Sequence, residues 1–147
     1  QSARAVIPTV ITQLLTGRKS IKLGALTPTR DFNFVVDTCR GFLALAGCDA
    51  AVGKTVNIGS GTEISIGDTV ALIAEIVGID DFKVECDEVR LRPANSEVER
   101  LVCDNSFMNA LTGHRHQYDL RAGLTQTIEW LRQPDNLKRY KADQFNV

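Results

Sequence analysis

Residues 29–37 have the sequence Thr-Arg-Asp-Phe-Asn-Phe-Val-Val-Asp. A turn precedes them at Thr27-Pro28-Thr29, because proline fixes the backbone φ angle that tight turns need. The apolar and β-branched residues predict a strand at 32–36. Asp37 has a short acidic side chain of the kind that caps helix N-termini. The stretch therefore predicts a turn, a strand and the start of a helix, with Arg30 placed where the turn meets the strand.

Helical and strand-like spacings alternate on both sides of this stretch. Upstream, apolar residues at helical spacing predict a helix over 7–15 that ends at Gly17, followed by a half-buried strand at 20–24. Downstream, the helix after Asp37 has an apolar stripe made of Cys39, Phe42, Leu43 and Ala46. The further predicted elements are a strand at 55–59, a helix opened by a capping box at Ser65 and ended by Gly78, a strand at 82–85, and helices capped by Asp104 and Asp119.

Helices interleaved with short strands predict an α/β fold. The chain has 147 residues, a length typical of one domain. No repeat, low-complexity segment or linker divides it. We therefore expect residues 1–147 to form a single domain.

Composition argues against several classes of protein. Lys and Arg number 17, Asp and Glu 18, and the formal net charge is −1. This balance argues against broad binding of nucleic acid or anionic membrane. No apolar run approaches the roughly 20 residues that a spanning helix needs. The four cysteines form no C-x-x-C pair and no zinc-ligand spacing, which predicts reduced thiols, no metal site and a cytoplasmic protein.

Two motifs resemble catalytic or phosphate-binding signatures without their context. Gly53-Lys54-Thr55 lacks the first glycine of a P-loop and precedes a predicted strand, where a P-loop needs a helix. His114 and His116, the only histidines, are expected to be exposed in a loop between two helices. No orienting acid for a catalytic triad is visible beside them. We therefore predict no catalytic residue.

Two arginines indicate anion binding. Arg30 follows the turn described above, and Arg92 lies in Arg-Leu-Arg-Pro with Asn95 three residues later. A planar guanidinium suits bidentate contact with a phosphate, and two of them can bind a diphosphate. Either arginine alone is more typical of a surface ion pair.

The 29–37 stretch resembles the R-D-F-x-[YF]-V-x-D signature of the NAD-dependent nucleotide-sugar epimerases and dehydratases, which are extended short-chain dehydrogenases. Further pieces occur in the family's order along essentially the whole chain: 5–8, 21–24, 56–61, 90–93, 104–113 and 120–130. The resemblance is to the second half of the family only. It implies an α/β C-terminal substrate-binding part of helices and short strands, without the N-terminal Rossmann core.

The resemblance also implies site residues. Arg30 and Arg92 match the arginines that contact the substrate's diphosphate in the family. The nucleobase pocket, for uridine or thymidine, would be lined by Ala5, Val6, Ile21 and Leu23. Asn95 matches a position near the ribose where many relatives have Asp, and an amide can still bind a hydroxyl.

The family's glycine-rich NAD loop and its Tyr-x-x-x-Lys pair do not occur in this chain. We therefore expect no cofactor here, although the full-length family uses NAD, and no catalysis by this chain alone. The expected ligand is a weakly bound UDP- or dTDP-sugar. The alternative is a stand-alone binding or assembly module that has lost the ancestral activity.

The resemblance finally predicts an uncovered surface. Residues 37–60 would pack on the Rossmann domain, so without that domain the strand 55–59, Phe42 and Leu43 lack their neighbours. We expect these surfaces to pair in a homodimer or a larger homo-oligomer.

Overall fold

The structure, a computed structural model, describes residues 5–91 and 96–140, which form two compact units. Unit 1 consists of the chain up to Pro28, Ser65–Glu99, and the chain from Leu124 onward. Unit 2 consists of Thr29–Ile64 and Arg100–Gly123. Each unit therefore combines segments that are far apart in the sequence. The mixed helices and short strands are those of the predicted α/β class.

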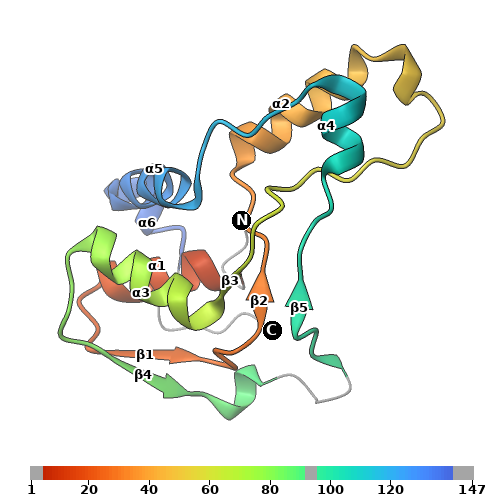
Figure 1. Ribbon diagram of the computed structural model, residues 1–147. Coiled ribbons are helices and arrows are strands. Elements are labelled where there is room, and N and C mark those ends of the chain that lie inside the picture. The colour runs from red at the N-terminus through yellow and green to blue at the C-terminus, as the bar shows by residue number, and fades with distance from the viewer. Residues whose placement is uncertain (1–4, 92–95, 141–147) are drawn as a thin grey trace. The chain divides into compact units, whose positions relative to one another are not determined.

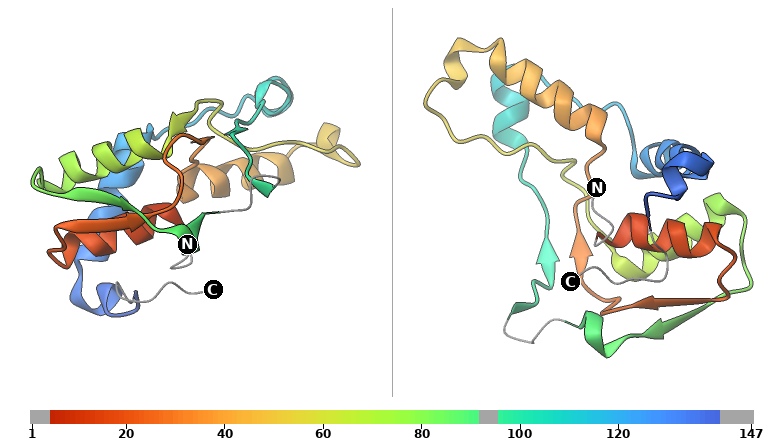
Figure 2. Two further views of the ribbon diagram at one scale, coloured as in Figure 1. Left: turned by 90° about the horizontal axis from the view of Figure 1, so that it is seen from below. Right: turned by 180° about the vertical axis from the view of Figure 1, so that it is seen from behind.

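Unit 1 contains a two-stranded parallel sheet and the helices packed near it (Figure 1). The strands are β1 (Ser20–Leu23) and β4 (Lys83–Cys86), in register from Ser20 opposite Lys83 to Leu23 opposite Cys86. The helices and short turns are α1 (Val6–Leu15), α3 (Ile66–Val77), η2 (Glu88–Arg90) and α6 (Pro134–Leu137). α1 packs against α3, as both views of Figure 2 show. The buried apolar side chains of unit 1 come from α1, β1, α3 and the helix over 120–132, and include Val10, Ile11, Leu14, Ile21, Val70, Ile73, Leu124, Ile128 and Leu131.

The ends of α3 confirm the predicted capping signals. The Ser65 hydroxyl accepts a hydrogen bond from the Asp68 backbone N–H at 2.9 Å and donates to the Asp68 carboxylate at 2.6 Å. At the other end Gly78 has a φ of 84°, a left-handed conformation that glycine adopts without strain. The helix therefore begins and ends where local sequence signals predicted.

Unit 2 contains short strands and helices (Figure 1). The strands have the order β3–β2–β5, and β2 and β5 are parallel with Thr29 opposite Arg100. Their bounds are β2 (Thr29–Arg30), β3 (Ile64–Ser65), whose second residue belongs to unit 1, and β5 (Arg100–Leu101). The helices are α2 (Val35–Ala46), η1 (Asp49–Ala51) and α4 (Ser106–Thr112). Helix α5 (Leu120–Arg132) starts in unit 2 and continues in unit 1.

The predicted strand at 32–36 is wrong. The strand β2 ends at Arg30, and Val35 already lies in the first turn of α2, with Phe34 as its N-cap residue. The Phe34 ring lies 4.9 Å from the Tyr118 ring, centroid to centroid, at an angle of 56°. Its side chain thus packs locally at the helix start instead of in a sheet.

Asp37 is not the helix cap that was predicted. It lies inside the first turn of α2 and is fully buried. Its two carboxylate oxygens accept hydrogen bonds from the backbone N–H groups of Gln117 and Tyr118, both at 3.0 Å. A buried carboxylate needs such donors, so Asp37 joins α2 to the segment that precedes α5.

The predicted strand at 55–59 is also absent from the structure. The chain there forms no ladder, and Ile58 instead packs against α2, where a Cβ added at Gly41 would lie 2.8 Å from the Ile58 Cγ2. A strand is stabilised only by a neighbour on its edge. No second strand is paired with this segment in the part of unit 2 that the structure describes.

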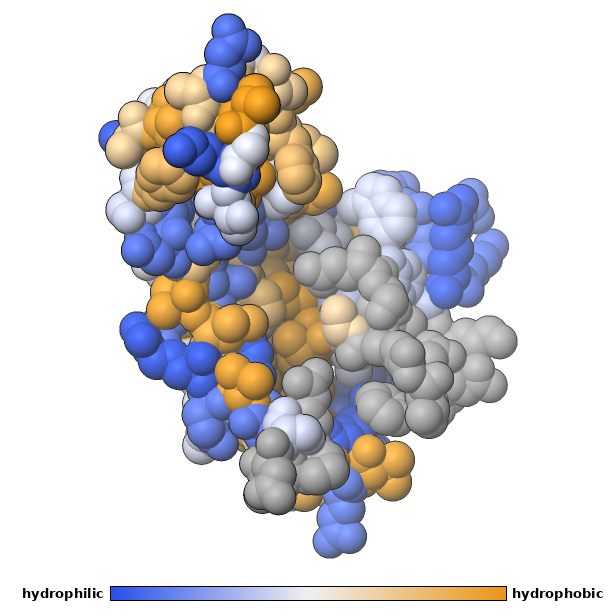
Figure 3. Space-filling model, turned by 90° about the vertical axis from the view of Figure 1, so that its right-hand side faces the viewer, coloured by the Kyte–Doolittle hydropathy of each residue, from blue (hydrophilic) through white to orange (hydrophobic). Residues whose placement is uncertain are grey.

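The apolar stripe predicted for α2 does not form a core. Phe42 is 62% exposed and Leu43 73% exposed, whereas the buried positions of α2 are Asp37 and Gly41. Apolar side chains gather on the upper part of Figure 3, where α2, η1 and α4 lie in Figure 1. Other exposed apolar residues of unit 2 include Val35, Val52, Leu101 and Phe107. None of the helices within residues 5–91 and 96–140 has the length and apolar content needed to cross a bilayer.

Candidate functional site

Arg30 lies at the end of β2, in the short parallel sheet of unit 2. Its side chain is half-buried, and Nη1 donates a hydrogen bond to the Thr29 carbonyl oxygen at 2.7 Å. The next backbone N–H, that of Asp31, donates to the Leu101 carbonyl oxygen at 2.9 Å and extends the pairing with β5. The first bond holds the guanidinium, and the second fixes the backbone next to the arginine.

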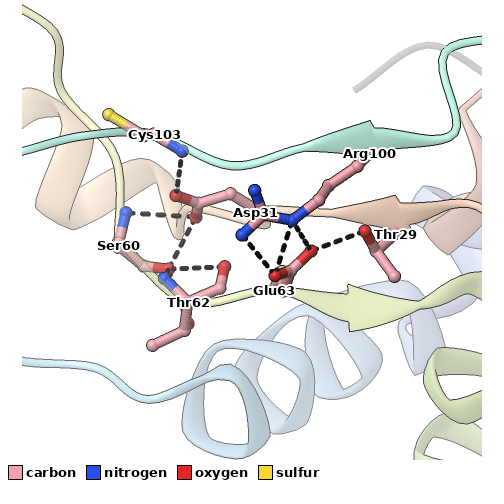
Figure 4. Close-up of polar contacts among 7 residues, drawn as sticks. All are labelled: Thr29, Asp31, Ser60, Thr62, Glu63, Arg100 and Cys103. Atoms are coloured by element: carbon pink, nitrogen blue, oxygen red, sulfur yellow. Dashed lines mark hydrogen bonds and ion pairs between the residues drawn. The ribbon is translucent and has the colours of Figure 1, made fainter.

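Asp31 joins three separate segments of unit 2 (Figure 4). One carboxylate oxygen accepts from the Ser60 N–H at 3.1 Å and from the Ser60 hydroxyl at 2.6 Å. The other oxygen accepts from the backbone N–H groups of Gly61 at 2.9 Å and Cys103 at 3.2 Å. Hydrogen bonds to an ionised acceptor are stronger than neutral ones. The carboxylate thus has a structural role and is occupied by four donors.

Glu63 and Arg100 form a second polar cluster beside it (Figure 4). The Arg100 guanidinium donates to both Glu63 oxygens, at 2.7 to 3.0 Å, and the Thr29 hydroxyl donates to the same carboxylate at 2.7 Å. These bonds hold the pKa of Glu63 below its ordinary value, mainly through Arg100 and then Thr29. They also raise the pKa of Arg100. Arg100 therefore forms an ion pair with the acid that directly precedes β3.

The residues predicted for the nucleotide-sugar site belong to different units. Ala5, the N-cap of α1, and Val6 belong to unit 1, as do Ile21 and Leu23, which are buried in its core. Arg30 belongs to unit 2. Arg92 and Asn95 lie outside the described residues.

The expectation that both histidines are exposed is wrong. His114 is only 7% exposed and His116 is half-buried, with ring centroids 5.3 Å apart. Burial lowers the pKa of His114, and the charges of His116, Arg40 and Arg115 lower it further, against the opposing effect of Asp37. The 114–116 segment gives no local signal of burial, because the α2 residues that act on His114, Asp37 and Arg40, are about 75 positions away in the sequence.

The carboxylate contacts are what sequence reasoning missed. Asp31 was visible only as part of the Arg-Asp-Phe motif, and Asp37 only as a cap. Within the described residues, no group of three or more His, Cys, Asp and Glu side chains could bind a metal ion. What unit 2 offers chemically is a rigid strand end that presents an arginine.

Comparisons with known proteins match this chain to sugar-nucleotide dehydratases and epimerases. The family model described as GDP-mannose 4,6 dehydratase matches residues 1–127. The UDP-glucose 4-epimerase of Mycolicibacterium smegmatis is 33% identical over 119 residues, which cover 81% of this chain and 36% of that protein. The dTDP-glucose 4,6-dehydratase of Streptomyces griseus is 30% identical over 130 residues, covering 88% of this chain and 38% of that protein.

A solved structure is similar to this chain as well. The Bordetella bronchiseptica enzyme WbmF, in complex with NAD+ and UDP, has 27% identity and a TM-score of 0.71. The similarity covers 93% of this chain and 39% of that one. The chain therefore spans less than half the length of each of these three proteins.

Proposed function

The chain belongs to the family of NAD-dependent nucleotide-sugar epimerases and dehydratases, and we propose that it binds the nucleotide-sugar substrate of such an enzyme without catalysing the reaction alone. The observation that carries the proposal is the match over residues 1–127, which includes the Arg-Asp-Phe motif. The names of two relatives specify glucose linked to UDP and to dTDP. The solved structure of a third contains UDP.

Arg30 is the residue of the described chain to which we assign the diphosphate. Its backbone is fixed by β5 on one side and by the four donors to Asp31 on the other. A binding group on a rigid element loses little conformational freedom when its ligand arrives. Arg92 is proposed as the second diphosphate contact and Asn95 as a ribose contact. The nucleobase side is proposed to comprise Ala5, Val6, Ile21 and Leu23.

A titration with UDP, followed by ¹H–¹⁵N NMR, tests this assignment. We expect saturable shifts at Arg30 and its neighbours, and at least tenfold weaker binding by Arg30→Gln, because a charge-assisted hydrogen bond contributes about 1.5–3 kcal/mol. Arg139→Gln is the matched control, since Arg139 is exposed in unit 1. Shifts confined to residues far from Arg30 and Arg92 would contradict the proposal.

The same titration with NAD+ tests the cofactor assignment. The described chain has no glycine-rich turn between a strand and a helix, which dinucleotides require. We expect no saturable shift at millimolar NAD+. Protection of the chain against thermal unfolding by NAD+ would count against a role limited to the sugar nucleotide.

A second candidate function is that of a stand-alone assembly module. The observation that favours it is the exposed apolar surface of unit 2, formed by Phe42, Leu43 and Val52. Val52 is 81% exposed, which is unusual for a large apolar side chain in a group of such residues. Self-association without UDP binding would favour this function over the first.

A further inference from the structure

Unit 2 contains a cavity of about 420 Å³ between one face of α2 and the segment 112–117. The α2 side contributes Arg40 together with two small or apolar residues one turn later. The opposite side contributes His114, Arg115 and His116. The nucleotide-sugar site proposed above includes none of these residues, and Leu43 on the α2 side also belongs to the exposed apolar surface of unit 2.

The two walls are joined at both ends. At one end the buried Asp37 carboxylate accepts the N–H groups of Gln117 and Tyr118. At the other end the Cys48 thiol lies 3.6 Å from the Leu111 carbonyl oxygen, to which it donates a weak hydrogen bond. The cavity is therefore a fixed feature of this unit and does not depend on how the units are arranged.

Positive charge dominates the cavity. Arg40 is exposed and forms no ion pair within the described residues, and Arg115 Nη1 donates to the His114 carbonyl oxygen at 2.8 Å. The acid that faces His114 is Asp37, whose two oxygens are already occupied by backbone N–H groups. Two guanidiniums without a free carboxylate disfavour a metal cation and favour an anion.

Both imidazoles have an unsatisfied nitrogen. The Nε2 atoms of His114 and His116 are buried and have no hydrogen-bond partner. A buried polar atom without a partner is rare in native structures and asks for an explanation. Both residues line the cavity, and the χ2 torsion of an imidazole has a broad distribution, so a change of χ2 would bring each Nε2–H to a ligand there.

We propose that this cavity binds a phosphate-type oxyanion through Arg40, Arg115, His114 and His116. Arg40 provides the planar pair of donors that fits two phosphate oxygens. The imidazoles donate to the remaining oxygens. The anion thereby satisfies both ring nitrogens and offsets the excess positive charge.

The two histidines make the test direct, because the chain has no others. Their Cε1–H resonances are followed by ¹H NMR during titration with inorganic phosphate, against sodium chloride at equal ionic strength. We expect both resonances to shift saturably with phosphate alone. We also expect the pKa of His114 to rise when phosphate is bound, since an anion favours the charged imidazole.

Two arginine variants distinguish phosphate binding in the cavity from a general effect of ionic strength. Arg40→Gln, on an exposed position, should weaken phosphate binding about tenfold or more. Arg139→Gln, an exposed arginine of unit 1, should leave it unchanged. Equal phosphate binding by the wild type and Arg40→Gln would overturn the proposal, as would a response to Zn²⁺ with none to phosphate.

The test of the cavity and the test of the proposed function have separate readouts, so that either proposal can fail while the other holds. UDP binding at Arg30 is read from backbone shifts near residue 30, and phosphate binding here is read from the histidine resonances. Histidine shifts that persist in Arg30→Gln would support the cavity even if UDP does not bind. Histidine shifts that vanish in Arg30→Gln would show that phosphate acts elsewhere, and would overturn the proposal.

Discussion

Single carboxylates determine how the segments of unit 2 are held together. Asp31 and Asp37 each accept backbone N–H groups from residues about 30 to 80 positions away. Both acids are visible in the sequence, and the Arg-Asp-Phe motif drew attention to the first. Their donors could not be predicted, because a hydrogen bond between distant segments depends on the tertiary fold and leaves no local spacing.

Asp31→Asn should lower the free energy of unfolding by about 2 kcal/mol. The amide loses the charge and cannot accept four hydrogen bonds as a carboxylate does. Asp81→Asn is the control, because its ion pair with Lys19 is exposed and should contribute about 0.5 kcal/mol. Urea unfolding measures both, and equal losses for the two variants would show that the Asp31 cluster is not stabilising.

His114 should make the protein sensitive to mild acid. Its pKa is lowered by folding, so the unfolded chain binds the proton more readily than the folded one. Stability is then fully present above the unfolded pKa of about 6.5 and is lost as the pH falls toward the lower, folded value. His114→Gln should remove this part of the pH dependence, as measured by urea midpoints at pH 7.5 and pH 5.5. An equal loss of stability at pH 5.5 in the wild type and in His114→Gln would show that other groups cause the pH dependence.

At the scale of elements, helices were predicted well, whereas only two of the four predicted strands, at 20–24 and 82–85, are present as β1 and β4. The helix over 6–15 and α3 follow from apolar periodicity and caps, which are local signals. The predicted strands at 32–36 and 55–59 were wrong, because a strand also needs a partner that local sequence does not specify. The short β2 and β5 form only where Asp31 and Arg100 hold distant segments side by side.

The end of α3 offers a paired test of backbone conformation. Gly78→Ala should destabilise the protein by about 1 kcal/mol, because Gly78 has a φ of 84° although no atom lies near the new Cβ. Gly47→Ala, at the end of α2, should be nearly neutral, since Gly47 has a φ of −92° and its nearest neighbour is 3.7 Å away. Thermal unfolding of both variants checks this. A larger loss for Gly47→Ala would refute the strain argument.

At the scale of the whole molecule, the family was predictable from ordered motifs, whereas the division into two units was not. The motifs are short and occur along both units, so they specify ancestry without specifying which segments pack together. The exposure of Phe42 and Leu43 in the apolar surface of unit 2 was anticipated by the resemblance, whereas that of Val52 was not. Ile58, expected at that surface too, instead packs against Gly41.

Leu43→Lys tests self-association through that surface. We expect the wild type to form a dimer or larger oligomer at micromolar concentration, because burying each large apolar side chain contributes about 1.5–3 kcal/mol. Leu43 is 73% exposed, so lysine should leave the fold intact and shift the chain to a monomer. Gln133→Lys, on an exposed position of unit 1, is the control. Light scattering that shows a monomeric wild type would refute the assembly prediction.

The interleaving of the two units governs how the protein responds to mechanical force. The chain passes between the units after Pro28, Ile64, Glu99 and Gly123, and unit 1 contains both outer segments. A pull applied at the two chain ends, as in an optical trap, therefore loads unit 1 first. Unit 2 bears tension only after the contacts among the three segments of unit 1 have ruptured. We expect an extension trace in which unit 1 unfolds before unit 2. A pull applied at residues 31 and 123, which both belong to unit 2, should give the reverse order.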